Sequence, residues 1–330
     1  MDQRELKRYL NVIKRAVAII ESMMDHDDNG LLESLSSHVL PIIAQELTTH
    51  QITKVEPTPI EIKPLVTITP EQQQARKKHI DELLQIDCWP EAVPPFLVAT
   101  DVSVEDQVNR ANAVLDMMVD KSLDGLDFLD FGCGDGWIAQ QANKRGVKSA
   151  VGYDIKTSTT WASIKNVNFT SDFHSIQSSK FDAIMLYDVL DHCIDPILVM
   201  SQVKNLLKRD GSVYIRCHPW VSRHATHLYK QGINKSYLHL FLTFDEIKDL
   251  INQEPFFTRM EKDPIQAYRW WFDAFEIKKE RFVKEPVSEF FHVQSFKELL
   301  SNEQQIPLDQ IDSFLKLMEI QFVDYKIQLK

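Results

Sequence analysis

Residues 129–137 read LDFGCGDGW, and they join two predicted elements. The apolar run at 126–131 predicts a strand, and the residues from Trp137 to about Arg145 predict a helix. Three of the nine glycines of this 330-residue chain lie in the turn between them: Gly132, Gly134 and Gly136. Glycine allows sharp backbone turns and lets a ligand approach without a Cβ in the way. We therefore expect a ligand to contact the backbone at this turn.

Short apolar runs alternate with helical segments on both sides of the turn. Such alternation implies parallel βαβ units with right-handed crossovers, so the predicted fold class is α/β, a doubly wound, mostly parallel sheet. Strand-like patterns near the end of the chain predict antiparallel strands that close one sheet edge. The predicted strands are 126–131, 150–153, 167–170, 181–187, 212–216, 268–277 and 320–329, and further helices are predicted at 197–207 and 308–318.

The chain is predicted to have two regions. Residues 1–95 would form an N-terminal helical region, with a helical hairpin at its start and a proline-containing linker at 57–70. Residues 96–330 would form a Rossmann-like domain with an irregular insertion at about 218–242, and Thr243 with Glu246 predicts a capped helix after it. The apolar seam of the N-terminal helices favours packing within the chain, with an oligomer contact as the alternative.

The charge and the cysteines exclude some functions. A net charge of −11 gives no broad basic field for phosphates, so nucleic acid is disfavoured as a partner, although a local basic groove is not excluded. A nucleic-acid partner would be favoured if four basic residues converged on one pocket: Arg216, Arg223, Lys230 and Lys235. No window approaches a membrane span, and four cysteines without a CxxC pattern predict a reduced, cytoplasmic protein with no membrane partner.

The spacing of the glycines narrows the class of ligand. A phosphate-binding Walker loop would need GxxxxGK[ST], which is absent, and a dinucleotide fingerprint needs GxGxxG. Here the spacing is GxGxG and the bulky Trp137 stands where the third glycine would be. The second predicted strand ends in Gly-Tyr-Asp, and Asp154 is placed to accept both hydroxyls of a ribose. Together these features indicate an adenosine-containing ligand.

Four motifs in order resemble the class I S-adenosylmethionine-dependent methyltransferases. They are DFGCGDG at 130–136, GYD at 152–154, FDAIMLYDVLDHCIDP at 181–196 and LLKRDGSVYI at 206–215. The resemblance implies S-adenosyl-L-methionine as cofactor. It also implies that Gly132, Gly134 and the neighbouring Cys133 and Gly136 line its methionine part, that Asp130 holds its amino group, and that Asp154 binds its ribose. By the same resemblance, Asp172 meets the adenine amine, and Tyr187 and Asp188 lie beside the sulfonium.

The methyl acceptor is less well indicated. Motifs typical of the base-amine, cytosine and protein-arginine classes are absent, so a small-molecule acceptor is favoured, with an RNA or protein acceptor as an alternative. A second alternative is a non-catalytic protein of this fold that acts as a cofactor-binding scaffold or assembly subunit.

The candidate catalytic residues are Asp188, His192 and His218, which follow the fourth and fifth predicted strands. The two histidines are candidate bases because their pKa is ordinarily near neutrality. Two segments partly resemble metal-binding patterns, Asp25–Ser36 and Cys217–His227. The first lacks the glutamate that completes a calcium loop, and the second matches no common zinc spacing, so no metal site is predicted.

Overall fold

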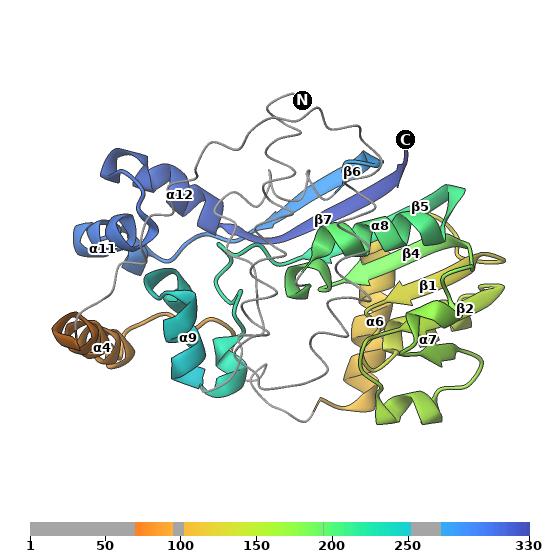
Figure 1. Ribbon diagram of the computed structural model, residues 1–330, viewed down its shortest axis with the longest axis horizontal. Coiled ribbons are helices and arrows are strands. Elements are labelled where there is room, and N and C mark those ends of the chain that lie inside the picture. The colour runs from red at the N-terminus through yellow and green to blue at the C-terminus, as the bar shows by residue number, and fades with distance from the viewer. Residues whose placement is uncertain (1–69, 95–101, 194, 252–271) are drawn as a thin grey trace, which may run out of the picture. The chain divides into compact units, whose positions relative to one another are not determined.

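The computed structural model describes residues 70–94, 102–193, 195–251 and 272–330 (Figure 1). The chain divides into two compact units, Met1–Thr69 and Pro70–Lys330, and only the second is described. The predicted N-terminal hairpin, the linker and the Asp25–Ser36 pattern lie outside the described residues. Within the described residues, no helix has the length and apolar character needed to cross a bilayer.

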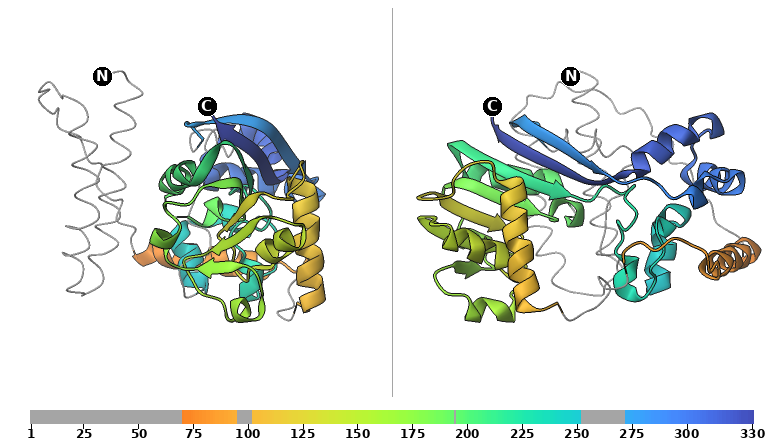
Figure 2. Two further views of the ribbon diagram at one scale, coloured as in Figure 1. Left: turned by 90° about the vertical axis from the view of Figure 1, so that its right-hand side faces the viewer. Right: turned by 180° about the vertical axis from the view of Figure 1, so that it is seen from behind.

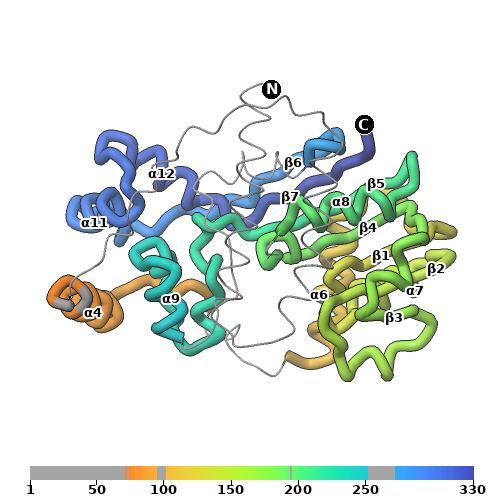
Figure 3. Tube along the Cα trace, viewed as in Figure 1, coloured from red at the N-terminus to blue at the C-terminus, as the bar shows by residue number. Residues whose placement is uncertain are grey.

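The core of the second unit is a seven-stranded sheet with the order β3-β2-β1-β4-β5-β7-β6 (Figure 3). The first five strands pair in parallel, whereas β7 runs antiparallel to both β5 and β6. This confirms the predicted fold class. The strands are β1 Asp127–Phe131, β2 Ser149–Tyr153, β3 Asn168–Thr170, β4 Phe181–Tyr187, β5 Leu207–Cys217, β6 Phe275–Lys284 and β7 Ile320–Leu329.

The last predicted strand before the C-terminal one, 268–277, lies partly outside the described residues, which resume at Phe272. Its described part differs from the prediction, because β6 begins at Phe275 and runs on to Lys284. The reason within the described residues is a turn, in which the amide of Phe275 donates to the carbonyl of Phe272 (2.8 Å). The Phe272 side chain is buried against Tyr325, with ring centroids 5.0 Å apart. Phe272 therefore packs in the core and does not pair as part of a strand.

Helices cover both faces of the parallel part of the sheet (Figure 1). Helices α6 (Val104–Met118) and α7 (Trp137–Lys144) bury apolar side chains on one face, and α8 (Pro196–Leu206) buries them on the other. Asp195 caps α8 by accepting from the amides of Ile197 and Leu198 (3.0 Å each). The chain order reverses between β1 and β4, which makes the ends of these strands the topological switch point, where α/β folds bind ligands.

A second apolar core joins the insertion to four helices (Figure 2). The insertion contains two 3-10 turns, η5 (Leu228–Gln231) and η6 (Leu238–Phe241), and most of it is buried. Trp89 lies in this core, and its indole N–H donates to the carbonyl of Ser236 (2.7 Å). The helices are α4 (Pro70–Leu84), α9 (Phe244–Ile251), α11 (Gln294–Gln304) and α12 (Ile311–Met318).

The predicted capping box at α9 is present. The Glu246 amide donates to Thr243 Oγ1 (3.2 Å), and the Thr243 amide donates to Glu246 Oε2 (2.7 Å). Residues 70–94 pack into the second core, because Leu83 and Trp89 are buried there. The division of the chain near residue 95 stays a prediction.

Candidate functional site

The glycine turn is tied to the end of the neighbouring strand. The amides of Gly132 and Cys133 both donate to the carbonyl of Tyr153 (2.7 and 2.9 Å), and the amide of Gly136 donates to the carbonyl of Cys133 (2.8 Å). All three glycines have positive φ, namely 79° at Gly132, 49° at Gly134 and 84° at Gly136. L-residues rarely adopt this conformation, which explains why a third of the glycines of the chain lie in this turn.

The three glycines differ in the space around them. A Cβ at Gly132 would overlap the side chain of Val189, and a Cβ at Gly136 would lie 2.5 Å from the ring of Phe169. At Gly134 a Cβ would meet nothing within 4 Å, and this glycine is exposed. The first and third glycines therefore allow close packing of the protein on itself, whereas Gly134 leaves open space in front of the backbone.

The carboxylate of Asp154 lies beside that open space. Its Oδ2 accepts from the amide of Gly134 (2.9 Å), and its Oδ1 accepts from the amide of Lys156 (3.0 Å). Asp154 is half-buried, so the carboxylate is held in place and still accessible. Next to it, Ile155 is 78% exposed, which offers an apolar surface beside the carboxylate that the sequence analysis did not identify.

Asp130 lies beneath the turn and is almost completely buried. Its Oδ2 accepts from the amide of Ala139 in α7 (3.2 Å). Burial raises the pKa of Asp130 to about 7, with a smaller contribution from the charge of Asp154. Cys133 is half-buried, and burial together with Asp130 raises the pKa of its thiol, so it is not an activated nucleophile.

Asp172 is exposed, and it caps a short 3-10 turn, η3 (Phe173–Ser175). Its Oδ1 accepts from the amide of His174 (2.9 Å). A second side chain, Trp161, binds the glycine turn from this side, because its indole N–H donates to the carbonyl of Gly134 (2.8 Å) and its ring stacks on Phe169 with centroids 5.1 Å apart. The role of Asp172 in binding adenine stays a prediction.

Asp188 follows β4 directly and adopts a left-handed conformation, with φ 55°. Its amide donates to the carbonyl of Arg216 in β5 (2.9 Å), which fixes the strained residue between the two strand ends. Non-glycine residues in this conformation are uncommon, and they gather at functional sites. The neighbouring Val189 contacts the glycine turn, as shown above, so Asp188 lies next to the proposed cofactor loop.

The structure brings the three predicted catalytic residues together in two interlocked pairs. His218 Nε2 lies 3.6 Å from Asp188 Oδ1, and His192 Nε2 lies 3.7 Å from Asp191 Oδ2. The same Asp191 oxygen accepts from the amide of His218 (3.3 Å). Asp191 was not among the predicted site residues, although its position in the VLDH segment of the fourth motif was the signal that could have identified it.

The pKa values of the two carboxyl groups, Asp188 and Asp191, are shifted in opposite directions. Burial opposes ionisation of Asp188, but the facing His218 outweighs it and lowers the pKa of Asp188 below its ordinary value. Burial and then the charge of Asp188 raise the pKa of Asp191 to about 7. Burial opposes protonation of His218, yet Asp188 raises the pKa of His218 overall. The site thus holds one charged carboxylate paired with a histidine and a second carboxyl that is protonated below neutrality.

Two more histidines from the insertion pack around His218. The ring centroids of His224 and His227 lie 4.6 and 5.5 Å from that of His218. Burial lowers the pKa of His224 to about 2, and burial also lowers the pKa of His227, so both are neutral near pH 7. Among the residues that the structure describes, no group of three or more histidine, cysteine or acidic side chains is arranged to hold a metal ion.

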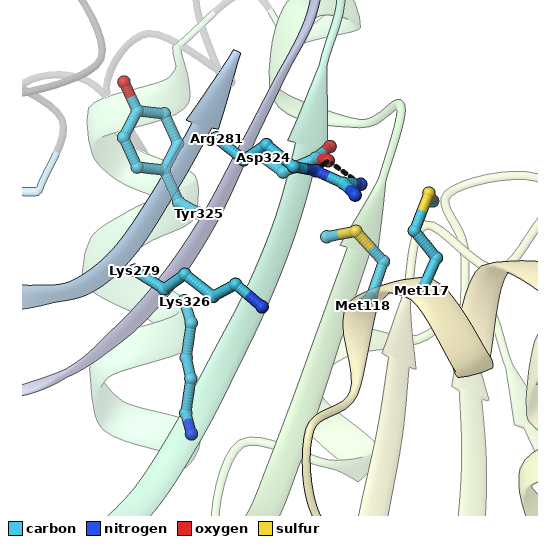
Figure 4. Close-up of a pocket in the computed structure, with 7 residues that line it drawn as sticks. All are labelled: Met117, Met118, Lys279, Arg281, Asp324, Tyr325 and Lys326. Atoms are coloured by element: carbon cyan, nitrogen blue, oxygen red, sulfur yellow. Dashed lines mark hydrogen bonds and ion pairs between the residues drawn. The ribbon is translucent and has the colours of Figure 1, made fainter. Parts of the chain in front are cut away.

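Tyr187 precedes Asp188, and two guanidinium groups lie near its ring. Those of Arg110 and Arg216 are each 5.7 Å from its ring centroid. Arg216 is buried and forms a bidentate pair with Asp324, with Nε 2.6 Å from Oδ1 and Nη2 2.8 Å from Oδ2. Arg281 binds the same carboxylate from β6 (Figure 4), so Arg216 is held by Asp324 and is not directed at a ligand.

The four basic residues that would have favoured nucleic acid do not converge. Arg216 is paired with Asp324, Arg223 forms an ion pair with Glu285 (2.5 Å), and Lys235 donates to the carbonyl of Ile86 (2.6 Å). Of these residues, Arg216 lies near Tyr187 at the candidate site, but its guanidinium is paired with Asp324. That nucleic acid is disfavoured as a partner stays a prediction.

Similarity to known proteins identifies the domain. A family model described as a methyltransferase domain matches residues 104–301. The chain is 26% identical over 132 residues to a ubiquinone biosynthesis O-methyltransferase of Neisseria meningitidis serogroup C, covering 36% of this chain and 50% of that protein. It is 23% identical over 113 residues to a mitochondrial ubiquinone biosynthesis O-methyltransferase of Dictyostelium discoideum, covering 28% and 35%. The chain thus spans half or less of the length of these curated relatives.

Solved structures with a similar fold include two with about 15% identity. One is an S-adenosylmethionine-dependent methyltransferase from Mesorhizobium loti (15% identity, TM-score 0.37, 65% of this chain and 95% of that one). Another is a cyclopropane synthase from Mycobacterium tuberculosis (15% identity, TM-score 0.43, 69% and 86%). Because the family model matches more than half of the sequence, the chain belongs to the methyltransferase domain family, the class I S-adenosylmethionine-dependent methyltransferases.

Proposed function

We propose that the protein transfers the methyl group of S-adenosylmethionine to a hydroxyl group of a small molecule, with His218 and Asp188 as the catalytic base. The observation that carries this proposal is the 3.6 Å pair of His218 and Asp188, which follow β5 and β4 directly, with Val189 against the glycine turn. The curated relatives named as O-methyltransferases support an oxygen acceptor on a small molecule.

The glycine turn fits this cofactor. Gly134 leaves open space in front of its backbone, and the Asp154 carboxylate beside that space can accept the ribose hydroxyls. The buried Asp130 carries a carboxyl group whose ionisation a cationic amino group would favour. The exposed Ile155 is placed to cover an apolar ring next to the ribose. In this proposal Gly132, Cys133 and Gly136 shape the turn.

The protein's contribution to the chemistry is mainly alignment. S-adenosylmethionine, when bound, supplies a methyl group that is already activated by a positively charged sulfur. Val189 holds the β4 end against the glycine turn, which places Tyr187 and Asp188 at the switch point of the sheet. A fixed approach of acceptor to methyl group, with water excluded, is the main source of rate enhancement in such a transfer.

A base is needed because a hydroxyl acceptor must lose its proton. Neutral His218 takes that proton, and the facing carboxylate of Asp188 stabilises the imidazolium that forms. Asp191 accepts from the His218 amide and so holds the backbone of the base in place. His192 forms the second pair with Asp191, and we assign it a supporting role in the same site.

Cofactor binding is tested by titration calorimetry with S-adenosylmethionine and S-adenosylhomocysteine. Asp154→Ala should weaken the binding of both at least tenfold, because it removes the carboxylate next to Gly134. Asp210→Ala, a change at an exposed residue near the start of β5, should leave the affinity unchanged. Absence of binding to the unaltered protein would rule out this function.

Turnover is tested by incubating the protein with methyl-labelled S-adenosylmethionine and fractionated cell extract. We expect label in a small-molecule fraction, at a rate that His218→Gln lowers about a hundredfold or more while S-adenosylhomocysteine affinity stays the same. Binding of the cofactor without label transfer to any fraction would favour the non-catalytic scaffold instead.

A further inference from the structure

A short segment that follows β2 binds the glycine turn from outside. The 3-10 turn η2 (Thr159–Ser163) begins after Ser158, whose Oγ accepts from the amide of Thr160 (3.3 Å) and so caps it. Ser158 Oγ also donates to Asp135 Oδ1 (2.6 Å), and Thr160 Oγ1 donates to the carbonyl of Asp135 (2.8 Å). The segment therefore binds Asp135 through both its side chain and its backbone.

Trp161 of the same segment binds the residue before Asp135. Its indole N–H donates to the carbonyl of Gly134 (2.8 Å). The indole ring stacks on Phe169 of β3, with centroids 5.1 Å apart and ring planes 10° from parallel. The Phe169 ring fills the space beside Gly136, where a Cβ would lie 2.5 Å from it. Ring packing therefore holds the Trp161 side chain with its N–H directed at the turn.

The carbonyl that Trp161 binds belongs to the central peptide of a β-turn. The amide of Gly136 donates to the carbonyl of Cys133 (2.8 Å), which closes a four-residue turn with Gly134 and Asp135 at its centre. The orientation of the peptide between the two central residues distinguishes one turn type from another. In a trans peptide the C=O and N–H groups point in opposite directions, so the bond from Trp161 also fixes the direction of the Asp135 amide.

Gly134 does not fix this peptide by itself. Glycine populates positive and negative φ about equally, and within the described part of the chain a Cβ at Gly134 would have no neighbour closer than 4 Å. The Gly134 amide is bound to Asp154 Oδ2 (2.9 Å), which leaves its carbonyl to be fixed. The thiol of Cys133 also contacts that carbonyl, but at 3.9 Å and as a weak donor. The orientation of the central peptide therefore depends mainly on Trp161.

From these contacts we propose that Trp161 is a positioning residue for S-adenosylmethionine, which holds the peptide between Gly134 and Asp135 in the orientation that the bound cofactor requires. The inference rests on the proposed function, in which this turn binds the cofactor. A turn that is held in its binding orientation beforehand loses less conformational entropy when the cofactor binds. Without the indole N–H the peptide samples both orientations, and the apparent affinity falls in proportion to the competent fraction.

The test compares two variants that each remove one hydrogen bond from an indole to a carbonyl. Trp161→Phe keeps an aromatic ring against Phe169 but lacks the donor to Gly134. The control, Trp89→Phe, removes the matching bond to the carbonyl of Ser236 (2.7 Å) in the second core. Titration calorimetry with S-adenosylhomocysteine should show at least fivefold weaker binding in Trp161→Phe. Trp89→Phe should lower the melting temperature and leave this affinity unchanged.

Two further measurements separate positioning from general stability. In Trp161→Phe, nitrogen relaxation dispersion should show exchange of the Asp135 amide on the microsecond-to-millisecond timescale, which saturation with S-adenosylhomocysteine suppresses. The unaltered protein should lack this exchange. Thr160→Val, a milder variant that removes the donor to the Asp135 carbonyl, should weaken S-adenosylhomocysteine binding about twofold.

Methyl transfer gives an independent readout. With methyl-labelled S-adenosylmethionine and the active extract fraction, Trp161→Phe should raise the KM for S-adenosylmethionine at least fivefold. Its kcat should stay within about a factor of two, because the residues assigned to the base are unchanged. A fall in kcat with an unchanged KM would contradict a role in positioning the cofactor.

Unchanged affinity of Trp161→Phe for S-adenosylhomocysteine would overturn the inference, because the Gly134 carbonyl would then need no partner. An equal loss of affinity in Trp89→Phe would overturn it too, since affinity would then follow the stability of the whole protein. Failure of the unaltered protein to bind S-adenosylhomocysteine would instead overturn the proposed function, so the two failures are distinguishable.

Discussion

Val189 occupies the space into which a Cβ of residue 132 would project, so only glycine fits at Gly132. Gly132 follows β1, and Val189 lies just beyond β4, the strand that pairs with β1 in parallel. This contact joins the turn that we assign to the cofactor with the residue pair that we assign to the base. The relative position of donor and acceptor is therefore set by packing between two strand ends.

The glycines of the turn should respond differently to alanine. Gly132→Ala should destabilise the protein by about 3 kcal/mol, because it combines a left-handed alanine with overlap on Val189. Gly134→Ala should cost only about 1 kcal/mol, since its Cβ meets nothing, but should weaken S-adenosylhomocysteine binding at least tenfold by entering the open space. Chemical denaturation and calorimetry measure the two effects.

The double variant Gly132→Ala/Val189→Ala checks the packing explanation. Removing the Val189 methyl groups should recover part of the stability lost in Gly132→Ala, which a thermodynamic cycle quantifies. Strict additivity of the two substitutions would show that the overlap is not the cause.

Asp130 should make folding stability depend on pH. Its folded-state pKa is raised to about 7, so between pH 4 and 7 the folded carboxyl keeps a proton that the unfolded one has lost. The contribution of Asp130 to folding stability is therefore fully present below the pKa of the unfolded state, and it is lost as pH rises toward 7. Asp130→Asn should therefore raise the free energy of unfolding of the ligand-free protein more at pH 8 than at pH 5, by about 2 kcal/mol. Thermal unfolding at the two pH values measures this difference.

Asp127 on the same strand is the matched control. Its hydrogen bond to Lys208 lowers the pKa of Asp127, so its carboxylate stabilises the fold above the unfolded pKa and the stability is lost at acid pH. Asp127→Asn should thus destabilise the protein at neutral pH, the opposite sign to Asp130→Asn. The same direction of change in both variants would be inconsistent with these pKa shifts. Asp130→Asn should also weaken S-adenosylmethionine binding.

Methyl transfer should rise with pH. Asp188 raises the pKa of His218 above its ordinary value, and only the neutral imidazole accepts a proton, so kcat/KM should increase through a midpoint above about 6.5. Asp188→Asn should move the midpoint down and lower the rate at its plateau about a hundredfold. Asparagine tolerates the left-handed backbone of residue 188, so the fold should be retained.

The exposed His292 provides a comparison for that profile. His292→Gln should leave both midpoint and rate unchanged. A midpoint that does not move in Asp188→Asn would mean that another group titrates in the assay, and it would remove Asp188 from the base.

Arg76 should anchor α4 to the rest of the unit. Its guanidinium binds Glu246 of α9 (2.6 Å) and Glu303 of α11 (2.5 Å), and it donates to the carbonyl of Phe241 (2.9 Å). These groups are only partly exposed, so Arg76→Met should lower stability by about 1–2 kcal/mol and speed proteolysis within residues 70–84. Lys78→Met, at an exposed pair on the same helix, should change neither. An unchanged proteolysis pattern in Arg76→Met would show that α4 is held by other contacts.

Most of the sheet was predictable because its signals are local. Apolar runs between polar turns predicted β1, β2, β4 and β7, and the glycine turn with Asp154 indicated an adenosine-containing ligand before any tertiary contact was known. The predicted strand at 268–277 was wrong at residues 272–274, which form a turn, because an apolar pattern does not distinguish a core contact of Phe272 from strand pairing. Residues 268–271 lie outside the described residues. Helices α6 and α11 were not predicted at all.

The acceptor side could not be predicted residue by residue. Nothing local marks Arg110 as a neighbour of Asp188, and the irregular pattern of the insertion does not predict its burial. The pairing of His218 with Asp188 and of His192 with Asp191 likewise depends on two strand ends being adjacent in the sheet.

The sequence by itself determined the parallel sheet, the turn built around Gly132, Gly134 and Gly136, and the class of cofactor, because backbone conformation and hydrophobic periodicity are properties of consecutive residues. Only the tertiary structure decided which carboxyl is charged, which histidine faces it and that Arg110 lies beside the pair. Those properties follow from burial and from distances between side chains that lie far apart in the chain, and no local pattern contains them.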